Sequence, residues 1–219
     1  MVSIKWLSHA GWLIKFKDST VVIDPYLNNN PKAVMKPADL TGIDYVIVTH
    51  EHFDHIGDSF EIAKNNHAKF VSIFETGQAA QKAGIPEGNV VGMNIGSDLI
   101  DLGKIKVAFT PAVHSGNEHG VIIQADGHTI YHAGDTALFT DMKLIKQLYH
   151  PDIAMLPIGG FFTMSPREAA MAAKYIGAKK VLPMHYNTFP PIVQDAKKFA
   201  KMVKGSKVII FESGEEKNL

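Results

Sequence analysis

The chain has 219 residues, of which 46% are hydrophobic and 20% are charged. This length and balance are typical of one globular domain spanning residues 1–219, and they exclude collagen, coiled coil and wholesale disorder. Basic and acidic side chains number 22 each, so the formal net charge is zero. We therefore expect neither an extended nucleic-acid surface nor attraction to an anionic membrane.

The chain contains no cysteine, one arginine (Arg167) and eleven histidines. Without thiolates, disulfides and a cysteine nucleophile are excluded, and a transition metal would have to be bound by imidazole and carboxylate. The N-terminal residues show no export signal, and no apolar run approaches the roughly 20 residues that span a bilayer. A cytoplasmic location is the expectation.

The first half alternates short strands with helices. A helix is predicted from Asp58 or Ser59 to about Asn66, and another over Gly77–Ala83, which Gly84 closes. The first three strands are short and separated by turns, which predicts an antiparallel meander. The predicted strands are Ile4–Ser8, Gly11–Phe16, Thr20–Ile23, Tyr45–Val48, Lys69–Phe74, Asn89–Met93 and Lys104–Thr110.

In the second half, Asp126-Gly127 and His128 between Val121–Ala125 and Thr129–His132 indicate a β-hairpin. A capping box at Ser165–Glu168 starts a helix that ends at Gly177. Further helices are predicted over Phe139–Tyr149 and Ile192–Val203, further strands over Ile153–Leu156, Lys180–Leu182 and Val208–Phe211, and a loose tail over Glu215–Leu219. Mixed strands and helices predict an α/β layer sandwich, and the lack of G-x-G-x-x-G and P-loop motifs argues against a doubly wound nucleotide fold.

The segment from Thr49 to His55 places three histidines and two carboxylates directly after a buried strand. In an extended segment, residues two apart project to the same side, so His50 and His52 can share one metal. Asp54 and His55, at the following turn, can reach a second. The alternatives are a solvated polar loop and a helix start that Asp54 merely caps. A cap needs only one polar residue, so it leaves three histidines unexplained.

Three more candidate ligands follow predicted strands: His114, Asp135 and His185. Loops at the carboxyl ends of strands are where α/β sheets place ligands. His119 competes with His114 but begins a strand, so His114 is preferred. Asp24, at the end of a strand, is either a turn residue or an acceptor for the N–H of a ligand histidine.

These motifs resemble the metallo-β-lactamase superfamily, whose H-x-H-x-D-H signature appears as residues 50–55. The resemblance extends to residues 6–11, 22–25, 110–114, 132–136 and 183–186, and is greatest to compact hydrolases related to ascorbate-6-phosphate lactonase. It implies a four-layer αββα sandwich and a dinuclear metal site. By position, one metal would be bound by His50, His52 and His114, the second by Asp54, His55 and His185, and Asp135 would bridge both.

The implied activity is cleavage of an ester, lactone or phosphodiester bond in a small molecule by a metal-bridged hydroxide. Asp54 would orient the hydroxide or accept a proton, and His9 would line the pocket or protonate the leaving group, unless it is an ordinary turn histidine. Zinc is the first expectation for both ions; Mn²⁺, Fe²⁺ and Ni²⁺ suit the same ligands.

Several other interpretations of the function stay open. A small nuclease or cyclic-nucleotide phosphodiesterase of the same fold is the main alternative. A di-iron redox protein would have glutamate where this chain has His52, and it would need a flavin partner. A non-catalytic metal-binding scaffold would lack one of the metal ligands. The tight connection from His114 to Gly120 suggests an open site for a larger substrate. The glycines and aromatics of residues 156–164, with Tyr186 and Asn187, are candidate substrate contacts, and a homo-oligomer is left open.

Overall fold

A computed structural model of the protein describes all 219 residues. The chain folds into two compact units, Met1–Ser97 with Glu212–Leu219 and Asp98–Phe211. The C-terminal segment therefore returns to the first unit. Each unit contains one seven-stranded mixed sheet. The helices are short, and none has the length and apolar character that crossing a membrane requires.

The first unit begins with the predicted antiparallel meander. Its strands are β1 (Ser3–Ser8), β2 (Gly11–Lys15), β3 (Thr20–Ile23), β4 (Tyr45–Ile47), β5 (Lys69–Ile73), β6 (Val90–Met93) and β14 (Glu216–Asn218). They lie in the order β14-β1-β2-β3-β4-β5-β6. Neighbours are antiparallel from β14 to β3 and parallel from β3 to β6. The meander is confirmed.

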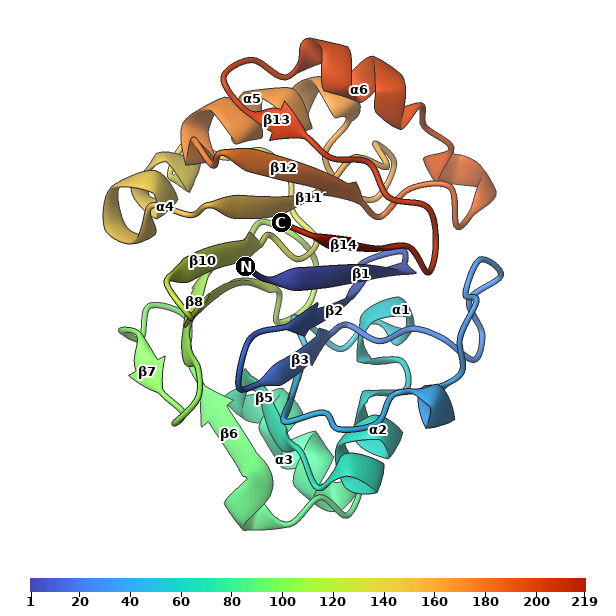
Figure 1. The fold of residues 1–219 in the computed structure, drawn as a ribbon, viewed down its shortest axis with the longest axis vertical. Helices are drawn as coiled ribbons and strands as arrows, with labels where there is room; N and C mark the ends of the chain where they lie inside the picture. Colours follow the sequence, from blue (N-terminus) through green and yellow to red (C-terminus); the bar gives the residue numbers. More distant parts are fainter. The chain divides into compact units, whose positions relative to one another are not determined.

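Helices α1 (Phe53–Ile56), α2 (Ser59–Asn66) and α3 (Phe74–Lys82) belong to this unit, with the short 3-10 turns η1 (Pro37–Asp39) and η2 (Glu87–Asn89). Helix α2 packs on β4, and α3 packs on β5 and β6 (Figure 1). The core between them is apolar and includes Val46, Ile62 and Phe70. The sequence predicted α2 correctly, but α3 begins at Phe74 and not at Gly77.

The strands of the second unit are β7 (Ile100–Asp101), β8 (Lys106–Pro111), β9 (His119–Ala125), β10 (His128–His132), β11 (Ile153–Pro157), β12 (Lys180–Met184) and β13 (Lys207–Val208). They lie in the order β13-β12-β11-β10-β9-β8-β7. Neighbours are antiparallel from β7 to β10 and parallel from β10 to β13. Its helices are α4 (Met142–Tyr149), α5 (Pro166–Ile176) and α6 (Ala196–Met202), with the 3-10 turn η3 (Pro190–Ile192). Helix α5 packs on β11, and α4 and α6 pack against α5 (Figure 1).

Two predicted turn and cap signals are confirmed in the second unit. His128 pairs with Ala125, so Asp126-Gly127 is a two-residue hairpin turn, with φ angles of 51° and 74°. These positive φ angles are the ones that a type I′ turn requires. At the start of α5, the side chains of Ser165 and Glu168 form the reciprocal capping box, and Gly177 ends the helix with φ 63°.

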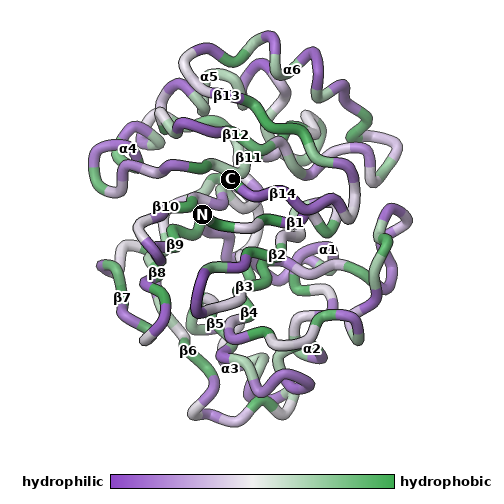
Figure 2. The backbone as a smooth tube through the Cα atoms, viewed as in Figure 1, coloured by the Kyte–Doolittle hydropathy of each residue, from purple (hydrophilic) through white to green (hydrophobic).

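Other predicted boundaries are also wrong, and α4 begins at Met142 and not at Phe139. Glu215–Leu219 is not a loose tail, because β14 pairs with β1. Helix α6 begins at Ala196 and not near Ile192, because Pro190 and Pro191 form η3 and Asp195 caps α6. The hydrophobic residues 208–211, green in Figure 2, extend beyond β13, which ends at Val208.

Candidate metal centre

The signature segment of the first unit changes conformation within a few residues after β4. His52 is extended, with φ −61° and ψ 145°, and α1 then places Asp54 and His55 on a single turn of helix. Gly57 ends α1 with φ 38°, and a Cβ at this position would lie 2.5 Å from the carbonyl oxygen of Pro25. Only glycine fits this close approach. The segment is thereby held against the turn that follows β3.

His50 and His52 bring two ring nitrogens together. His50 Nε2 lies 2.9 Å from His52 Nδ1, and the other nitrogen of His50 lies 3.1 Å from Thr49 Oγ1. Two nitrogens bound to one tetrahedral zinc ion are about 3.3 Å apart, given zinc–nitrogen bonds of about 2.0–2.1 Å. The observed distance is somewhat shorter than this, and a small rotation of either ring would let both nitrogens bind one ion.

Asp24 fixes the signature segment from the turn after β3. One carboxylate oxygen accepts the N–H of Thr49 at 2.8 Å; the other accepts the Thr49 hydroxyl at 2.7 Å and lies 2.8 Å from His55 Nδ1. Asp24 is fully buried. A carboxylate on Nδ1 holds the tautomer that presents Nε2 to a metal. Asp24 thus occupies the acceptor position that the sequence suggested.

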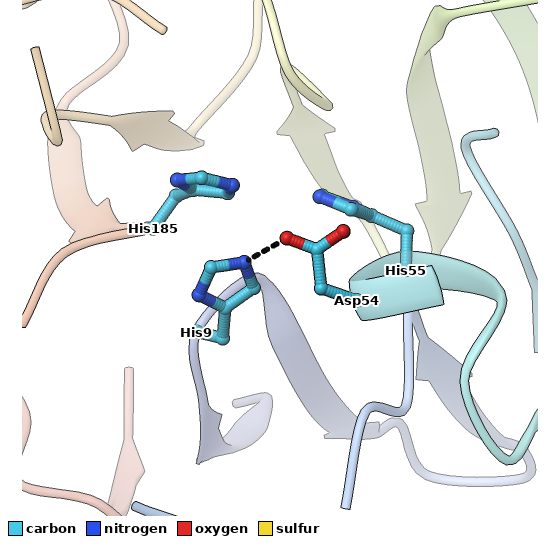
Figure 3. Close-up of side chains that lie close together, drawn as sticks. All are labelled: His9, Asp54, His55 and His185. Atoms are coloured by element: carbon cyan, nitrogen blue, oxygen red, sulfur yellow. Dashed lines mark hydrogen bonds and ion pairs between the residues drawn. The ribbon is translucent and has the colours of Figure 1, made fainter. Parts of the chain in front are cut away.

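His9 contacts Asp54 in the same unit. It lies in the turn between β1 and β2, where Ser8 and His9 have φ angles of 83° and 55°. His9 Nε2 is 3.0 Å from Asp54 Oδ2 (Figure 3). Trp6 Nε1 donates to the His9 carbonyl at 3.0 Å and anchors the turn. Ligand-type atoms of His9, Asp54 and His55 lie within 4.8 Å of one another.

In the second unit, two histidines face one carboxylate oxygen. Asp135 follows β10, and its Oδ2 lies 3.0 Å from His185 Nε2 and 3.7 Å from His114 Nε2. His185 follows β12 with φ 54°, and His114 lies between β8 and β9. Neutral imidazole and carboxylate form a donor set that suits divalent transition metals.

Glu118 is a site residue that the sequence did not reveal. Its buried carboxylate accepts the N–H of Asp135 at 3.2 Å. The two residues are seventeen positions apart, so no local spacing pattern points to this bond. Glu118 therefore helps to fix the backbone of a candidate ligand.

Two tyrosines close to these carboxylates have raised pKa values. Burial raises the pKa of Tyr26, and the charges of Asp54 and Asp58 raise it further. Burial also raises the pKa of Tyr131 strongly; a hydrogen bond with Thr110 opposes this rise and the charge of Glu118 adds to it. Both phenols therefore stay protonated at neutral pH and can donate hydrogen bonds.

The other histidines have structural surroundings. His119 is buried in β9, with its ring centroid 4.0 Å from that of Phe109. His132 Nδ1 accepts the N–H of Gly134 at 3.1 Å. His67 and His150 end α2 and α4 in the left-handed conformation.

Comparisons with known proteins give the family. The beta-lactamase superfamily domain matches residues 19–186. A UPF0173 metal-dependent hydrolase of Thermococcus kodakarensis is 46% identical over 230 residues, covering 100% of both chains, and one of Caldivirga maquilingensis is 43% identical, covering 99% of this chain and 97% of its own. The structure of Igni18, a metallo hydrolase from Ignicoccus hospitalis, superimposes with a TM-score of 0.91 at 37% identity and covers 98% of this chain and 97% of its own.

The chain therefore belongs to the beta-lactamase superfamily, among the UPF0173 metal-dependent hydrolases. The predicted metallo-β-lactamase fold is confirmed by the same likenesses. The predicted enzyme class, a metal-dependent hydrolase, agrees with the names of these relatives.

Proposed function

We propose that this protein is a dinuclear metal hydrolase that cleaves an ester, lactone or phosphodiester bond. His50, His52 and His114 bind one divalent ion, Asp54, His55 and His185 bind the second, and Asp135 binds both. Zinc is the first candidate for each ion.

One observation carries the proposal. His114 and His185 belong to different ions in this assignment, and each has Nε2 close to the same oxygen of Asp135, at 3.7 and 3.0 Å. A carboxylate shared between two ions needs one ligand of each ion beside it. The tautomer of His55 that Asp24 favours supports the assignment in the first unit.

The chemistry divides between the ions and the side chains. When bound, two divalent ions lower the pKa of a coordinated water and stabilise a developing oxyanion. Asp54 accepts the proton of the attacking water. His9 Nε2, 3.0 Å from Asp54 Oδ2, relays that proton to the leaving-group oxygen. When water attacks, the bond between the carbonyl carbon or phosphorus and this oxygen breaks. The leaving-group oxygen departs with the proton that the water has lost.

Metal analysis tests the ligand assignment. Protein stripped with a chelator and reloaded should bind two equivalents of metal per chain. Asp135→Ala should lower this number, because it removes the shared ligand, and His50→Ala should lower it as well. The control is His67→Asn, which alters a histidine outside the site and suits the left-handed conformation there. Unchanged stoichiometry in both ligand variants would contradict the assignment.

A substrate panel tests the reaction. The reloaded protein should hydrolyse bis(p-nitrophenyl) phosphate, esters or lactones when assayed with Zn²⁺ and Mn²⁺. His9→Gln should lower kcat and leave the metal content unchanged, because His9 is not one of the seven proposed ligands. If no member of the panel is turned over by protein that binds two metals, the hydrolase proposal fails.

A further inference from the structure

Four large apolar side chains are exposed on segments that carry or contact the candidate ligands of the second unit. We name this group the apolar rim, and its members are Val113, Phe161, Phe162 and Val193. Their exposed fractions are 52%, 69%, 48% and 68%. Single exposed apolar side chains are ordinary, whereas a contiguous group of them marks a binding surface.

The rim is tied to Asp135 through Thr136. The hydroxyl of Thr136 accepts the N–H of Val113 at 3.0 Å, and its carbonyl accepts the N–H of Met164 at 3.1 Å. Val113 directly precedes His114. Met164 ends the loop that carries Phe161 and Phe162. Val113 and the loop with Phe161 and Phe162 are therefore both anchored on the residue after Asp135.

The same loop is also packed against His185. A Cβ on Gly159 would lie 2.5 Å from the carbonyl oxygen of His185, so the loop backbone lies directly on this ligand. The Gln194 side chain donates to the Gly159 carbonyl at 3.0 Å, and the Gln194 N–H donates to Asn187 at 2.8 Å. These bonds of Gln194 hold the adjacent Val193 near the Gly159 loop and the segment that follows His185.

The rim is preformed and uncharged. The rings of Phe161 and Phe162 pack edge to face with centroids 4.8 Å apart. The three segments 110–117, 157–166 and 185–194 contain no Asp, Glu, Lys or Arg. An anionic substrate group would find no cationic side chain on them, whereas an alkyl or aromatic group would find aromatic and branched side chains.

We infer that the apolar rim binds the apolar substituent of a neutral ester or lactone. This inference rests on the proposed function. It narrows the substrate class to neutral esters and lactones, because a phosphodiester carries a negative charge at its reacting group. The hydrophobic contact would select the substrate, and metal held by the candidate ligands would polarise its carbonyl.

A chain-length series tests the inference. For p-nitrophenyl acetate, butyrate and octanoate, kcat/KM of the metal-loaded enzyme should rise about tenfold from acetate to octanoate, because added methylenes gain a surface to bury. The variant Phe161→Ser/Phe162→Ser should remove most of this rise, through a higher KM for octanoate. Octanohydroxamate should likewise bind more tightly than acetohydroxamate by calorimetry, and lose this advantage in the same variant.

The control is Leu148→Ser, which alters a similarly exposed side chain on α4 and should leave the series unchanged. A flat series for the wild-type enzyme would overturn the inference while leaving the hydrolase function intact. If the wild-type enzyme shows no activity toward any of these substrates, that result would instead count against the proposed function. Dissociation of an oligomer by the double variant, with the series unchanged, would make the rim a subunit interface and also overturn the inference.

Discussion

At the residue scale, Asp24 joins two segments of the first unit that are far apart in sequence. Its two oxygens contact Thr49 and His55, so the turn after β3 fixes both the entry to the signature segment and one candidate ligand. A buried carboxylate is held only where such polar contacts offset its desolvation. We therefore expect Asp24 to affect metal binding without being one of the proposed ligands.

We predict that Asp24→Asn weakens metal binding by about 10- to 100-fold, as loss of a carboxylate behind a ligand histidine does in other metal sites. An amide offers one oxygen where Asp24 offers two, so it cannot satisfy Thr49 and His55 together. Competition with a fluorescent chelator measures the affinity. Asp58→Asn is the matched control, because Asp58 accepts the N–H groups of Leu27 and Asn28 in the same unit. Equal effects of the two variants on metal affinity would show that Asp24 acts only on folding.

Residues of the candidate site could be predicted from the sequence where they form local patterns. The spacing of residues 50–55 and the placement of His114, Asp135 and His185 after strands pointed to the side chains now seen in two clusters, one in each unit. Glu118 and Thr136 could not be found in this way. Each acts through a bond with a backbone group of a distant segment, and such a bond leaves no periodic trace in the sequence.

At the scale of elements, the Glu216 side chain adds to the backbone pairing of β14 with β1. The Glu216 carboxylate accepts the Ser3 hydroxyl at 2.7 Å and lies 3.0 Å from Lys15 Nζ and 3.2 Å from Lys5 Nζ. Residues 215–219 are mostly polar, and the strand that they pair with lies at the other end of the chain. Local hydrophobic periodicity therefore predicted a tail, because non-local pairing and charge stabilise this strand.

The Ser3 hydrogen bond, followed by those from Lys15 and Lys5, lowers the pKa of Glu216 from 4.5 to about 2. A depressed carboxyl pKa stabilises the fold above the unfolded value of 4.5 and loses this contribution as the pH falls toward 2. Glu216→Gln should therefore lower the free energy of unfolding at pH 7 by up to about 1 kcal/mol, a value that exposure and salt keep small. Urea unfolding at pH 7 and at pH 3 should show a smaller difference at pH 3.

The control for this prediction is Glu212→Gln, which alters another carboxylate of the same C-terminal segment. It should leave the free energy of unfolding nearly unchanged at both pH values. A Glu216 effect that stays constant between pH 7 and pH 3 would argue against the ionised carboxylate as the cause.

Elements with strong local signals were predicted well, and those shaped by distant contacts were not. The capping box of α5 and the Asp126-Gly127 turn depend on residues within a few positions of one another. The start of α6 depends on the Pro190-Pro191 turn, which keeps the residues after it out of the helix. The sequence pattern therefore predicted a helix start near Ile192, four residues before the observed start at Ala196.

At the scale of the whole molecule, the two units repeat one pattern of strand directions. Three antiparallel pairs precede three parallel pairs in both sheets, and the change falls at β3 in the first unit and at β10 in the second. Asp24 follows β3, and Asp135 follows β10. The correspondence lies in the topology. Equivalent turns thus supply an aspartate that orients a ligand and an aspartate that is itself a proposed ligand.

Because we propose that the folded protein binds metal, we expect metal removal to lower its stability. A ligand that binds only the folded state adds about 2.7 kcal/mol per site at a free concentration of 100 times Kd. For a chain of this length we expect chelation to lower the melting temperature by about 5–10 °C per site. Calorimetry with and without chelator measures the shift, which Asp135→Ala should reduce and His67→Asn should leave intact. A melting temperature that is unaffected by chelator in the wild type would contradict tight metal binding by the folded protein.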